Sequence, residues 1–358
     1  MKIITISGTR PDLIRLSEII KRLDQSHQQI FVHAGQNFTA GLRDEFFKDL
    51  NLRQPDYQYN LTEQSTGFDY IGKMMVFIEE IIKKRKPERA LILGDTNSAL
   101  AAYVCKQMHL PVFHLEAGNR CYDDNVPEEV NRRIIDTCSE YLLTYTQRSR
   151  EQLLAEGYPP QKIIVVGNPI TEIVHKHFLS QKINYQPILK KYQLTKNSYL
   201  VATLHRTENV TNRAVLKKIT DALNQLAQKE KIILSVHPKL KTMLDKTKIR
   251  LHRNIIQSEP FGFKEFLSLV KNARVVLTDS GTVPEECCLL KIPCVLMRNT
   301  TERPELLENN SMVLSGTATQ SIIDCYNIAK KLSIGQPPTD YQSLEVSEKI
   351  VKIVSRLL

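Results

Sequence analysis

The sequence of 358 residues contains no tryptophan, only 13 glycines, and seven cysteines, an odd number without regular spacing. No run approaches the roughly 20 consecutive apolar residues that a membrane helix needs. The chain opens with Met1-Lys2-Ile3-Ile4-Thr5-Ile6, which is typical of a strand and not of a signal peptide. We therefore expect a cytoplasmic protein with free thiols and no membrane partner.

Several ligand-binding motifs are also missing. The chain has no Gly-x-Gly-x-x-Gly, which counts against NAD, and no Gly-x-x-x-x-Gly-Lys-Ser/Thr, which counts against an ATPase. The nine histidines form no His-Glu-x-x-His and no other metal-ligand spacing, so we predict no metal. The formal net charge of +10 permits an anionic partner. Because no basic tract is interleaved with aromatic residues, we expect no nucleic acid partner.

The length and the hydrophobic pattern predict two α/β domains. A chain of this length is too long for one ordinary core. Apolar, β-branched runs alternate with segments of helical periodicity over residues 1–170, and the same alternation resumes at residue 199. Such alternation indicates parallel, doubly wound sheets. We expect a Rossmann-like domain over 1–170, a second over 171–340 with a cleft between them, and a final helix over 341–358.

Two helices are predicted from their apolar stripes. Each stripe repeats at the spacing that places residues on one face of a helix. The first stripe comprises Phe68, Ile71, Met75, Ile78 and Ile82, and the second comprises Leu344, Ile350, Val351, Val354 and Leu358.

Three acidic residues occupy comparable places in the first domain. Asp95 follows the predicted strand 90–93, Glu116 follows the apolar run 111–115, and Glu128 stands at a predicted helix start. Ligands of an open parallel sheet collect outside the carboxyl ends of its strands. The three carboxylates are therefore candidates for acid–base groups in one crevice.

A structural role is the alternative for each acid, because acids after strands often cap the next helix. Their recurrence after consecutive strands favours the functional interpretation. Arg120, Arg132 and Arg133 lie close by in the sequence, and we expect them to hold anionic groups.

The second half contains a predicted diphosphate site. A strand end, a tight turn with backbone N–H groups and a helix start are predicted for the segment Thr278-Asp279-Ser280-Gly281-Thr282. Glu286, one turn later, would bind sugar hydroxyls. His205 follows another strand; a lone histidine is more often structural, but this one would point into the cleft. Arg10 and Arg303 would hold phosphate. Such groups without a nucleotide-hydrolysis motif suggest a nucleotide-sugar ligand.

Taken together, these motifs resemble the non-hydrolysing UDP-N-acetylglucosamine 2-epimerases over essentially the full chain. The resemblance implies a fold of the GT-B type, a C-terminal helix folded back on the first domain, a homodimer, and inversion of C2 of a UDP-N-acetylhexosamine without a cofactor. The matching motifs are Gly8-Thr9-Arg10-Pro11, Gly94-Asp95-Thr96, Glu116-Ala117-Gly118, Pro127-Glu128-Glu129-Val130-Asn131-Arg132, His205-Arg206, Asp279-Ser280-Gly281 and Thr301-Glu302-Arg303-Pro304-Glu305.

The family also implies roles for individual residues. Proton transfer would fall to Asp95, Glu116 and Glu128, with His205 near the diphosphate and the breaking C1–O bond; which carboxylate is base and which is acid stays open. The implied substrate-binding residues are Arg10, Ser280, Gly281 and Thr282 for the phosphates, Glu286 for the ribose, Phe261 and Phe266 for the uracil, and Arg303. Phe266 could equally be plain helix core.

Some positions depart from the commoner pattern of the family. Asp12 replaces a Glu, Arg15 replaces a Lys at a site position, and Asn37 replaces a His in a region linked to allosteric activation. The segments 14–17, 35–37 and 116–121 look more like the branch that acts on UDP-6-deoxy-N-acetylhexosamines, precursors for capsules and O-antigens. Thr301-Glu302-Arg303-Pro304 looks more like the general branch, so the group at C6 of the substrate stays open.

Three other functions remain at this point. A glycosyltransferase of the GT-B type would share the fold and the UDP site, but it gives no reason for three acids in the first domain. A nucleotide-sugar binding or regulatory protein would need no complete acid–base set. A hydrolysing epimerase would differ only in whether water reaches the glycal intermediate.

Overall fold

The computed structural model describes residues 1–35, 47–59 and 67–357. It divides the chain into two compact units. Unit 1 comprises Met1–Lys176 together with Thr339–Leu358, and unit 2 comprises His177–Pro338. These boundaries lie near those expected at residues 170 and 340. The departure expected at Asn37 lies outside the described residues.

Unit 1 is built on a seven-stranded sheet in the order β3-β2-β1-β4-β5-β6-β7, with every pair parallel. Both faces of a parallel sheet are covered by helices, which explains why its strands are continuous apolar runs. Ile3, Ile4 and Ile6, for example, are all buried. The strands are β1 (Lys2–Ser7), β2 (Gln28–His33), β3 (Tyr57–Gln58), β4 (Arg89–Leu93), β5 (Val112–Leu115), β6 (Tyr141–Thr144) and β7 (Ile163–Val165).

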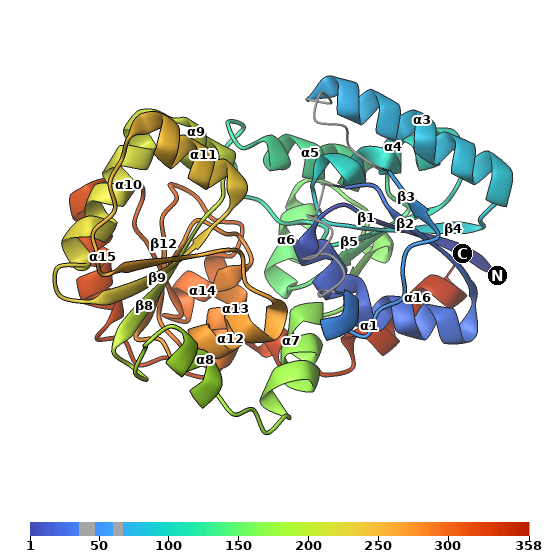
Figure 1. The fold of residues 1–358 in the computed structure, drawn as a ribbon. Coiled ribbons are helices and arrows are strands. Elements are labelled where there is room, and N and C mark those ends of the chain that lie inside the picture. The colour runs from blue at the N-terminus through green and yellow to red at the C-terminus, as the bar shows by residue number, and fades with distance from the viewer. Residues whose placement is uncertain (36–46, 60–66, 358) are drawn as a thin grey trace. The chain divides into compact units, whose positions relative to one another are not determined.

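Helices cover both faces of this sheet (Figure 1). Helix α1 packs against α7 and α16 on one face, whereas α4 contacts α3 and α5 on the other. The C-terminal helix therefore folds onto the first helix of the chain. The helices are α1 (Arg10–Ser26), α3 (Phe68–Arg85), η1 (Asn97–Leu100), α4 (Ala101–Gln107), α5 (Pro127–Cys138), α6 (Gln147–Ala155), η2 (Pro160–Lys162), α7 (Pro169–Val174), η4 (Thr339–Tyr341) and α16 (Val346–Arg356). A π-helix, η3 (His175–Leu179), spans the boundary to unit 2.

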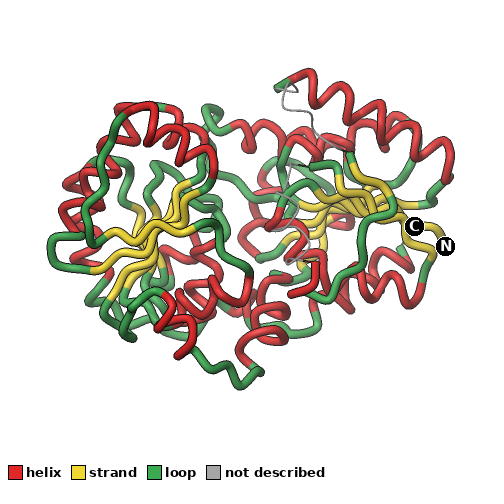
Figure 2. The backbone as a smooth tube through the Cα atoms, viewed as in Figure 1, coloured by secondary structure: helices red, strands yellow, loops and turns green. Residues whose placement is uncertain are grey.

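Unit 2 repeats this plan with a six-stranded parallel sheet in the order β10-β9-β8-β11-β12-β13. Figure 2 shows the strands of each unit gathered between helices. The apolar core on one face of the sheet is formed with α10, α11 and α15. The strands are β8 (Tyr199–Leu204), β9 (Lys231–Val236), β10 (Ile255–Ser258), β11 (Val275–Thr278), β12 (Cys294–Leu296) and β13 (Met312–Leu314). The helices are α8 (Gln186–Lys191), α9 (Thr207–Thr211), α10 (Arg213–Leu226), α11 (Pro238–Thr247), α12 (Phe263–Lys271), α13 (Val283–Leu290), α14 (Pro304–Glu308) and α15 (Thr319–Ala329).

Two details of the predicted apolar stripes are wrong. Phe68, placed on the buried face of its helix, is 90% exposed, and the buried residues of α3 include Tyr70 and Met74 instead. Phe68 is the first residue of α3, at the end of the apolar stripe. Leu344 precedes α16 and is 43% exposed, whereas Ile350 is buried as expected.

Two further observations concern both units. Within the described ranges, no helix is both long and apolar enough to span a lipid bilayer. All seven cysteines lie in these ranges and are free thiols.

Candidate active site

The predicted site residues gather at one edge of each sheet. In unit 1 the strand order reverses between β1 and β4, and in unit 2 it reverses between β8 and β11. The segments that follow such a pair of strands diverge and leave an opening where ligands of α/β proteins bind. The turns that follow these strands begin at Gly8, Gly94, His205 and Asp279.

The first turn of unit 1 needs glycine for a close backbone approach. A Cβ atom on Gly35 would lie 1.4 Å from the carbonyl oxygen of Gly8. A Cβ atom on Gly8 would lie 1.6 Å from Oγ of Ser98. The two backbones can therefore pack together only without side chains at these positions.

Asp12 anchors the start of α1, where Arg10 is the first helical residue. Its carboxylate accepts hydrogen bonds from the backbone N–H groups of Gly8 at 3.0 Å and Thr9 at 2.8 Å. Burial raises the pKa of Asp12 to about 6, against the lowering effect of these hydrogen bonds. Arg10 is half-buried, whereas Arg15, one turn further on, is only 3% exposed.

Asp95 is held by an arginine from α5. Arg132 donates from Nη2 to Oδ2 of Asp95 at 2.7 Å and from Nε to the same oxygen at 3.1 Å. Its remaining nitrogen, Nη1, donates to Oε2 of the buried Glu129 at 2.9 Å. Arg132 therefore bridges two carboxylates and fixes Asp95 relative to α5.

Glu129 is a residue that the sequence analysis passed over in favour of its neighbour. Its carboxylate is fully buried and accepts hydrogen bonds from the N–H groups of Cys121 and Tyr122. Burial opposes ionisation, but these N–H groups and Arg132 outweigh it and lower the pKa of Glu129. Glu128, the second residue of α5, is half-buried in the first turn of that helix.

Glu116 adopts an unusual backbone conformation for its residue type. Its φ angle is +78°, in a region that residues with a Cβ atom rarely adopt. Its Oε1 accepts a hydrogen bond from Nδ2 of Asn119 at 3.2 Å. A Cβ atom built on Gly94 would lie 3.7 Å from Oε2 of Glu116 and 3.8 Å from Oδ1 of Asp12, so both carboxylates border this turn. Such outliers are common at functional sites.

The three arginines expected to hold anionic groups are paired with carboxylates of the protein. Arg120 is 2% exposed and forms ion pairs with Asp136 at 2.8 Å and Glu156 at 2.7 Å. Arg133 reaches Glu129 at 3.1 Å and Asp124 at 3.2 Å. Sequence proximity suggested a ligand role because the buried carboxylate partners could not be identified from spacing.

In unit 2, His205 stands next to a buried carboxylate. Asp279 Oδ1 lies 3.2 Å from Nδ1 of His205, whose side chain is 45% exposed. Asp279 also accepts hydrogen bonds from the backbone N–H groups of His205 at 3.1 Å and Arg206 at 3.0 Å. Burial alone would raise the pKa of Asp279, but the nearby His205 charge and these hydrogen bonds lower it below its ordinary value.

The turn after β11 combines a glycine with nearby guanidinium groups. Ser280 donates its N–H to Oγ1 of Thr278 at 3.0 Å, and its Oγ lies 3.2 Å from Oγ1 of Thr282. A Cβ atom on Gly281 would lie 3.4 Å from Nη2 of Arg206 and 3.5 Å from Nη1 of Arg298. This arrangement of a tight turn, hydroxyl groups and positive charge before a helix suits an anionic ligand.

Arg298 and Arg303 are both engaged by buried acids. Arg298 forms a bidentate pair with Glu302, with nitrogen–oxygen distances of 2.9 and 3.0 Å. Arg303 is 4% exposed and donates from Nε to Glu285 at 2.5 Å. Glu286, expected to bind a sugar, is 5% exposed in the first turn of α13.

The two phenylalanines expected at a base-binding site lie together. The rings of Phe261 and Phe266 are stacked, with centroids 6.3 Å apart and an interplanar angle of 22°. Tyr192 approaches Phe261 edge-on, with centroids 6.0 Å apart. Phe261 is buried and Phe266 is half-buried, so Phe266 has a surface available for a ligand.

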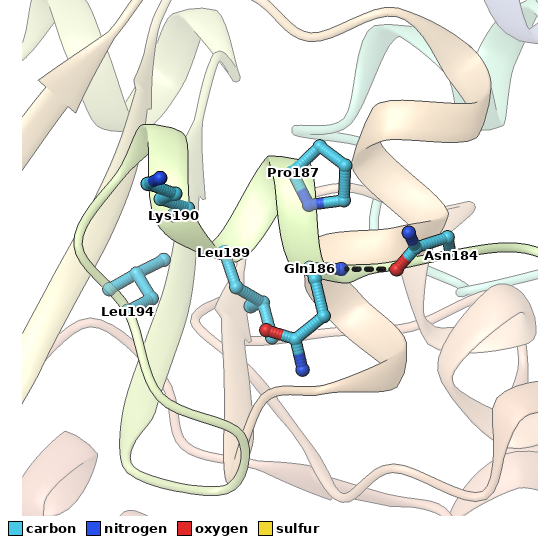
Figure 3. Close-up of a pocket in the computed structure, with 6 residues that line it drawn as sticks. All are labelled: Asn184, Gln186, Pro187, Leu189, Lys190 and Leu194. Carbon is cyan, nitrogen blue, oxygen red and sulfur yellow. Dashed lines mark hydrogen bonds between the residues drawn. The ribbon is translucent and has the colours of Figure 1, made fainter.

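Other possible sites are less specific. A surface pocket of about 550 Å³ in unit 2 is lined by Asn184, Gln186, Pro187, Leu189, Lys190 and Leu194, with Gln186 N–H donating to Oδ1 of Asn184 (Figure 3). None of the expected site residues lines it. Among the described residues there is no group of three or more His, Cys, Asp and Glu side chains arranged to hold a metal ion.

Comparisons with known proteins agree with these motifs. A family model described as UDP-N-acetylglucosamine 2-epimerase matches residues 21–355. The chain is 36% identical over 366 residues to the UDP-N-acetylglucosamine 2-epimerase of Methanocaldococcus jannaschii, covering 99% of each protein. It is also 33% identical over 363 residues to the UDP-2,3-diacetamido-2,3-dideoxy-D-glucuronate 2-epimerase of Pseudomonas aeruginosa, covering 100% of each.

The structural comparison gives the same result. The crystal structure of the Methanocaldococcus jannaschii UDP-GlcNAc 2-epimerase in complex with UDP-GlcNAc and UDP has a TM-score of 0.92 and 35% identity, covering 99% of each chain. The expected α/β fold of the GT-B type, with two Rossmann-like doubly wound units, is confirmed. The match of the family model to most of the chain and the identity of the relatives show that this chain belongs to the UDP-N-acetylglucosamine 2-epimerase family.

Proposed function

We propose that this chain is a non-hydrolysing 2-epimerase that interconverts UDP-GlcNAc and UDP-ManNAc, or a 6-deoxy relative of this pair. One observation supports the proposal: groups of the kinds that the reaction requires lie beside the strand-order reversal in each unit. Unit 1 contributes carboxylates around Gly94, and unit 2 contributes His205 and the turn at Ser280 with its nearby arginines. Membership in the family favours this function over the glycosyltransferase alternative.

The reaction needs no net oxidation or reduction. A base removes the proton from C2, the C1–C2 double bond forms, and the C1–O bond breaks so that UDP leaves with the electron pair. UDP then adds back to C1 of the 2-acetamidoglycal while C2 receives a proton on the opposite face. This route requires proton-transfer groups near both faces of C2 and positive charge at the departing diphosphate.

The carboxylates of unit 1 are proposed to move the protons. Asp95 is oriented by Arg132, Glu116 is oriented by Asn119, and Glu128 stands in the first turn of α5. A carboxylate held in this way loses little orientational freedom when the substrate binds. We assign the three residues to proton transfer as a set.

The groups of unit 2 are proposed to bind the UDP moiety. Ser280, Gly281 and Thr282 would contact the diphosphate through backbone and hydroxyl groups, and His205 would stabilise the charge on the departing oxygen. Glu286 would accept hydrogen bonds from the ribose hydroxyls. Phe261 and Phe266 would contact the uracil ring, supported by their stacked arrangement.

Three arginines complete the proposed substrate-binding set. Arg10, half-buried at the start of α1, would contact phosphate. Arg15 and Arg303 are nearly buried, and Arg303 is engaged by Glu285. Substitution of Arg303 by Lys therefore distinguishes a role in substrate binding from a purely structural role. A role in substrate binding predicts a changed KM at unchanged thermal stability, and a purely structural role does not.

The group at C6 of the substrate is tested by a panel of UDP-sugars. The purified protein is incubated separately with UDP-GlcNAc, its 6-deoxy relative and a UDP-diacetamido-glucuronate, and the products are separated by anion-exchange chromatography. A product epimeric at C2 from UDP-GlcNAc or its 6-deoxy relative supports the proposal and identifies the substrate, whereas turnover of the glucuronate alone would contradict the proposed substrate. Free ManNAc with UDP would indicate a hydrolysing enzyme, and turnover only with an added sugar acceptor would indicate a glycosyltransferase; either result would contradict the proposal.

We further propose that two copies of the chain associate through helices of unit 1. Large apolar side chains are exposed on α3, α4 and α5, which are neighbours in the fold. Exposed apolar groups of this kind mark interaction surfaces. They are Phe68, Val76, Tyr103, Val130 and Ile134. Light scattering should give a dimer mass for the wild type and a monomer mass for Ile134→Glu; a monomeric wild type would overturn the proposal.

A cytoplasmic location and a role in making surface polysaccharides complete the proposed function. The free thiols favour a reducing compartment. A UDP-N-acetylhexosamine epimer is an activated sugar, so a glycosyltransferase reaction must consume it. Cell fractionation followed by immunodetection tests the location.

A further inference from the structure

A chain of buried charges lies behind the two turns that carry Asp95 and Glu116. It consists of His114 on β5, Asp136 on α5, Arg120 in the loop after β5, and Glu156 at the end of α6. The side chains of the first three are fully buried, and that of Glu156 is 28% exposed. The proposed reaction gives no direct role to any of these four residues.

His114 stands between two hydrogen-bond acceptors. Its Nδ1 lies 2.7 Å from Oδ1 of Asp136, and its Nε2 lies 2.9 Å from the carbonyl oxygen of Gly94. An ionised Asp136 and the carbonyl oxygen of Gly94 can only accept, so with Asp136 ionised beside Arg120 both contacts form as hydrogen bonds when each ring nitrogen carries a hydrogen. The geometry therefore favours an ion pair between the imidazolium form of His114 and the carboxylate of Asp136.

The other members of the chain balance this charge. Asp136 receives Nη2 of Arg120 at 2.8 Å, and Arg120 also binds Glu156 through Nε and Nη2, each at 2.7 Å. Two cations thus alternate with two anions. Burial opposes ionisation of Asp136, but His114 and Arg120 outweigh it and lower the pKa of this carboxyl group. A buried ion is retained only when such partners compensate for lost hydration.

Two neighbouring members of this chain, His114 and Asp136, reach the backbone at the two proposed catalytic turns. Gly94, whose carbonyl receives His114, directly precedes Asp95. Gly118, whose N–H donates to Oδ2 of Asp136 at 3.3 Å, follows Glu116 by two residues. Both glycines have a φ angle of +77°, and Glu116 itself is at +78°. One ion pair therefore ties together the two turns, and in one of them Glu116 has a backbone conformation that is unfavourable for a residue with a Cβ atom.

We propose that the His114 imidazolium and Asp136 are positioning residues, which hold the Gly94-Asp95 turn and the Glu116–Gly118 turn in one fixed relation for proton transfer at C2. This inference rests on the proposed epimerase function and extends it. Neither residue touches the substrate. Loss of either one lets the two turns shift independently, so the carboxylates of Asp95 and Glu116 no longer reach the reacting carbon together.

The test uses three variants and one control. In His114→Gln the amide nitrogen can still donate to Gly94, in His114→Ala neither bond remains, and Asp136→Asn removes the charge that His114 faces. The control is Glu172→Gln, because Glu172 is a buried carboxylate of unit 1 that accepts hydrogen bonds from Ser347 N–H at 2.8 Å and Oγ at 2.6 Å, in α7. All four are measured for kcat, KM, UDP affinity and thermal stability.

The expected result separates positioning from simple stabilisation. His114→Ala and Asp136→Asn should lower kcat about a hundredfold at unchanged UDP affinity, since neither residue is hydrogen-bonded to Arg10 or to the proposed UDP-binding groups of unit 2. His114→Gln should recover part of this loss. Glu172→Gln should lose thermal stability but retain kcat. If kcat of the folded His114 and Asp136 variants equals that of the wild type, or falls equally in the control, the positioning role is overturned.

A second measurement on the wild type does not depend on turnover. Long-range nitrogen–proton NMR of 15N-labelled protein, with the His114 signals identified by their loss in His114→Gln, reports the protonation of each ring nitrogen. Two protonated nitrogens support the bridge, and a neutral ring contradicts it. If the wild type turns over no UDP-sugar while His114 is doubly protonated, the proposed function fails although the bridge exists; a neutral ring in an active enzyme overturns the bridge alone.

Discussion

Asp279 and His205 form a pair in which a fully buried carboxylate faces a half-exposed imidazole, with 3.2 Å between Oδ1 and Nδ1. The same carboxylate accepts the backbone N–H groups of residues 205 and 206. Asp279 therefore determines both the position of the loop and the orientation of the ring. The opposite ring nitrogen, Nε2, is left as the one that His205 can direct at a ligand.

Asp279→Asn should lower kcat by about tenfold or more. Asparagine can preserve hydrogen bonding to the loop but removes the negative charge beside the His205 ring. Steady-state kinetics with the substrate identified in the UDP-sugar panel measures the effect. Asp221→Asn provides the control. The side chain of Asp221, in unit 2, is 41% exposed and pairs with Lys217 at 2.7 Å. Equal kcat values for Asp279→Asn and the wild type would show that the charge of Asp279 does not contribute to turnover.

Gly281→Ala should weaken UDP binding while leaving the fold intact. The added Cβ atom would lie 3.4 Å or more from its neighbours Arg206, Arg298 and Glu302, which is ordinary contact with side-chain ends. It would nevertheless occupy the surface from which the backbone approaches a diphosphate. Isothermal titration calorimetry with UDP should show a rise in Kd of about tenfold, equivalent to about 1.4 kcal/mol. Unchanged affinity at unchanged melting temperature would argue that the diphosphate binds elsewhere.

Arg132→Leu should destabilise unit 1 by up to about 3–5 kcal/mol, because the fully buried Glu129 loses one of its two arginine partners and keeps only the more exposed Arg133. It should also abolish turnover by releasing Asp95. A urea titration followed by circular dichroism measures the stability. The double variant Arg132→Leu with Glu129→Leu should recover much of the stability but none of the turnover. Recovery of both would show that the arginine serves only the fold.

Asp12 should make the stability of the wild type depend on pH. Its folded-state pKa of about 6 is raised above the ordinary value of 3.8 by burial. A raised pKa means that its stabilising contribution is complete below about pH 4 and is lost as the pH rises through 6, on the order of 3 kcal/mol in all. Relative to Asp12→Asn, the free energy of unfolding of the wild type should therefore fall between pH 4 and pH 7. Parallel pH curves for the two proteins would contradict this.

The strand positions and the sites of the main motifs could be predicted because they follow local rules. Apolar runs such as Lys2–Ser7 are buried on both faces, and a glycine or acid at the end of such a run marks the carboxyl edge of a parallel sheet. Short edge strands escaped prediction. Met312–Leu314 and Ile255–Ser258 are strands of three and four residues, whose identity depends on a neighbouring strand more than on their own pattern.

The partners of charged residues could not be read from the sequence. Arg120 was expected at a ligand site, but it belongs to a buried chain that includes Glu156, 36 positions away. Glu129 is the buried acid in the first turn of α5, although Glu128 has the same local signals. Such choices depend on which face of a helix meets the sheet and on distant carboxylates. The one sequence signal for Glu129 is that two acids stand beside each other in the first turn of α5.

The most direct test of the account is proton NMR of UDP-GlcNAc incubated with the protein in D2O, without any added cofactor, followed by the 6-deoxy relative. Elimination and re-addition of UDP require C2 to exchange its hydrogen with the solvent through the proton-transfer groups. The account predicts deuterium at C2 together with the C2-epimeric UDP-sugar for one of these substrates. Epimerisation without deuterium at C2, or no exchange with either UDP-sugar, would contradict it.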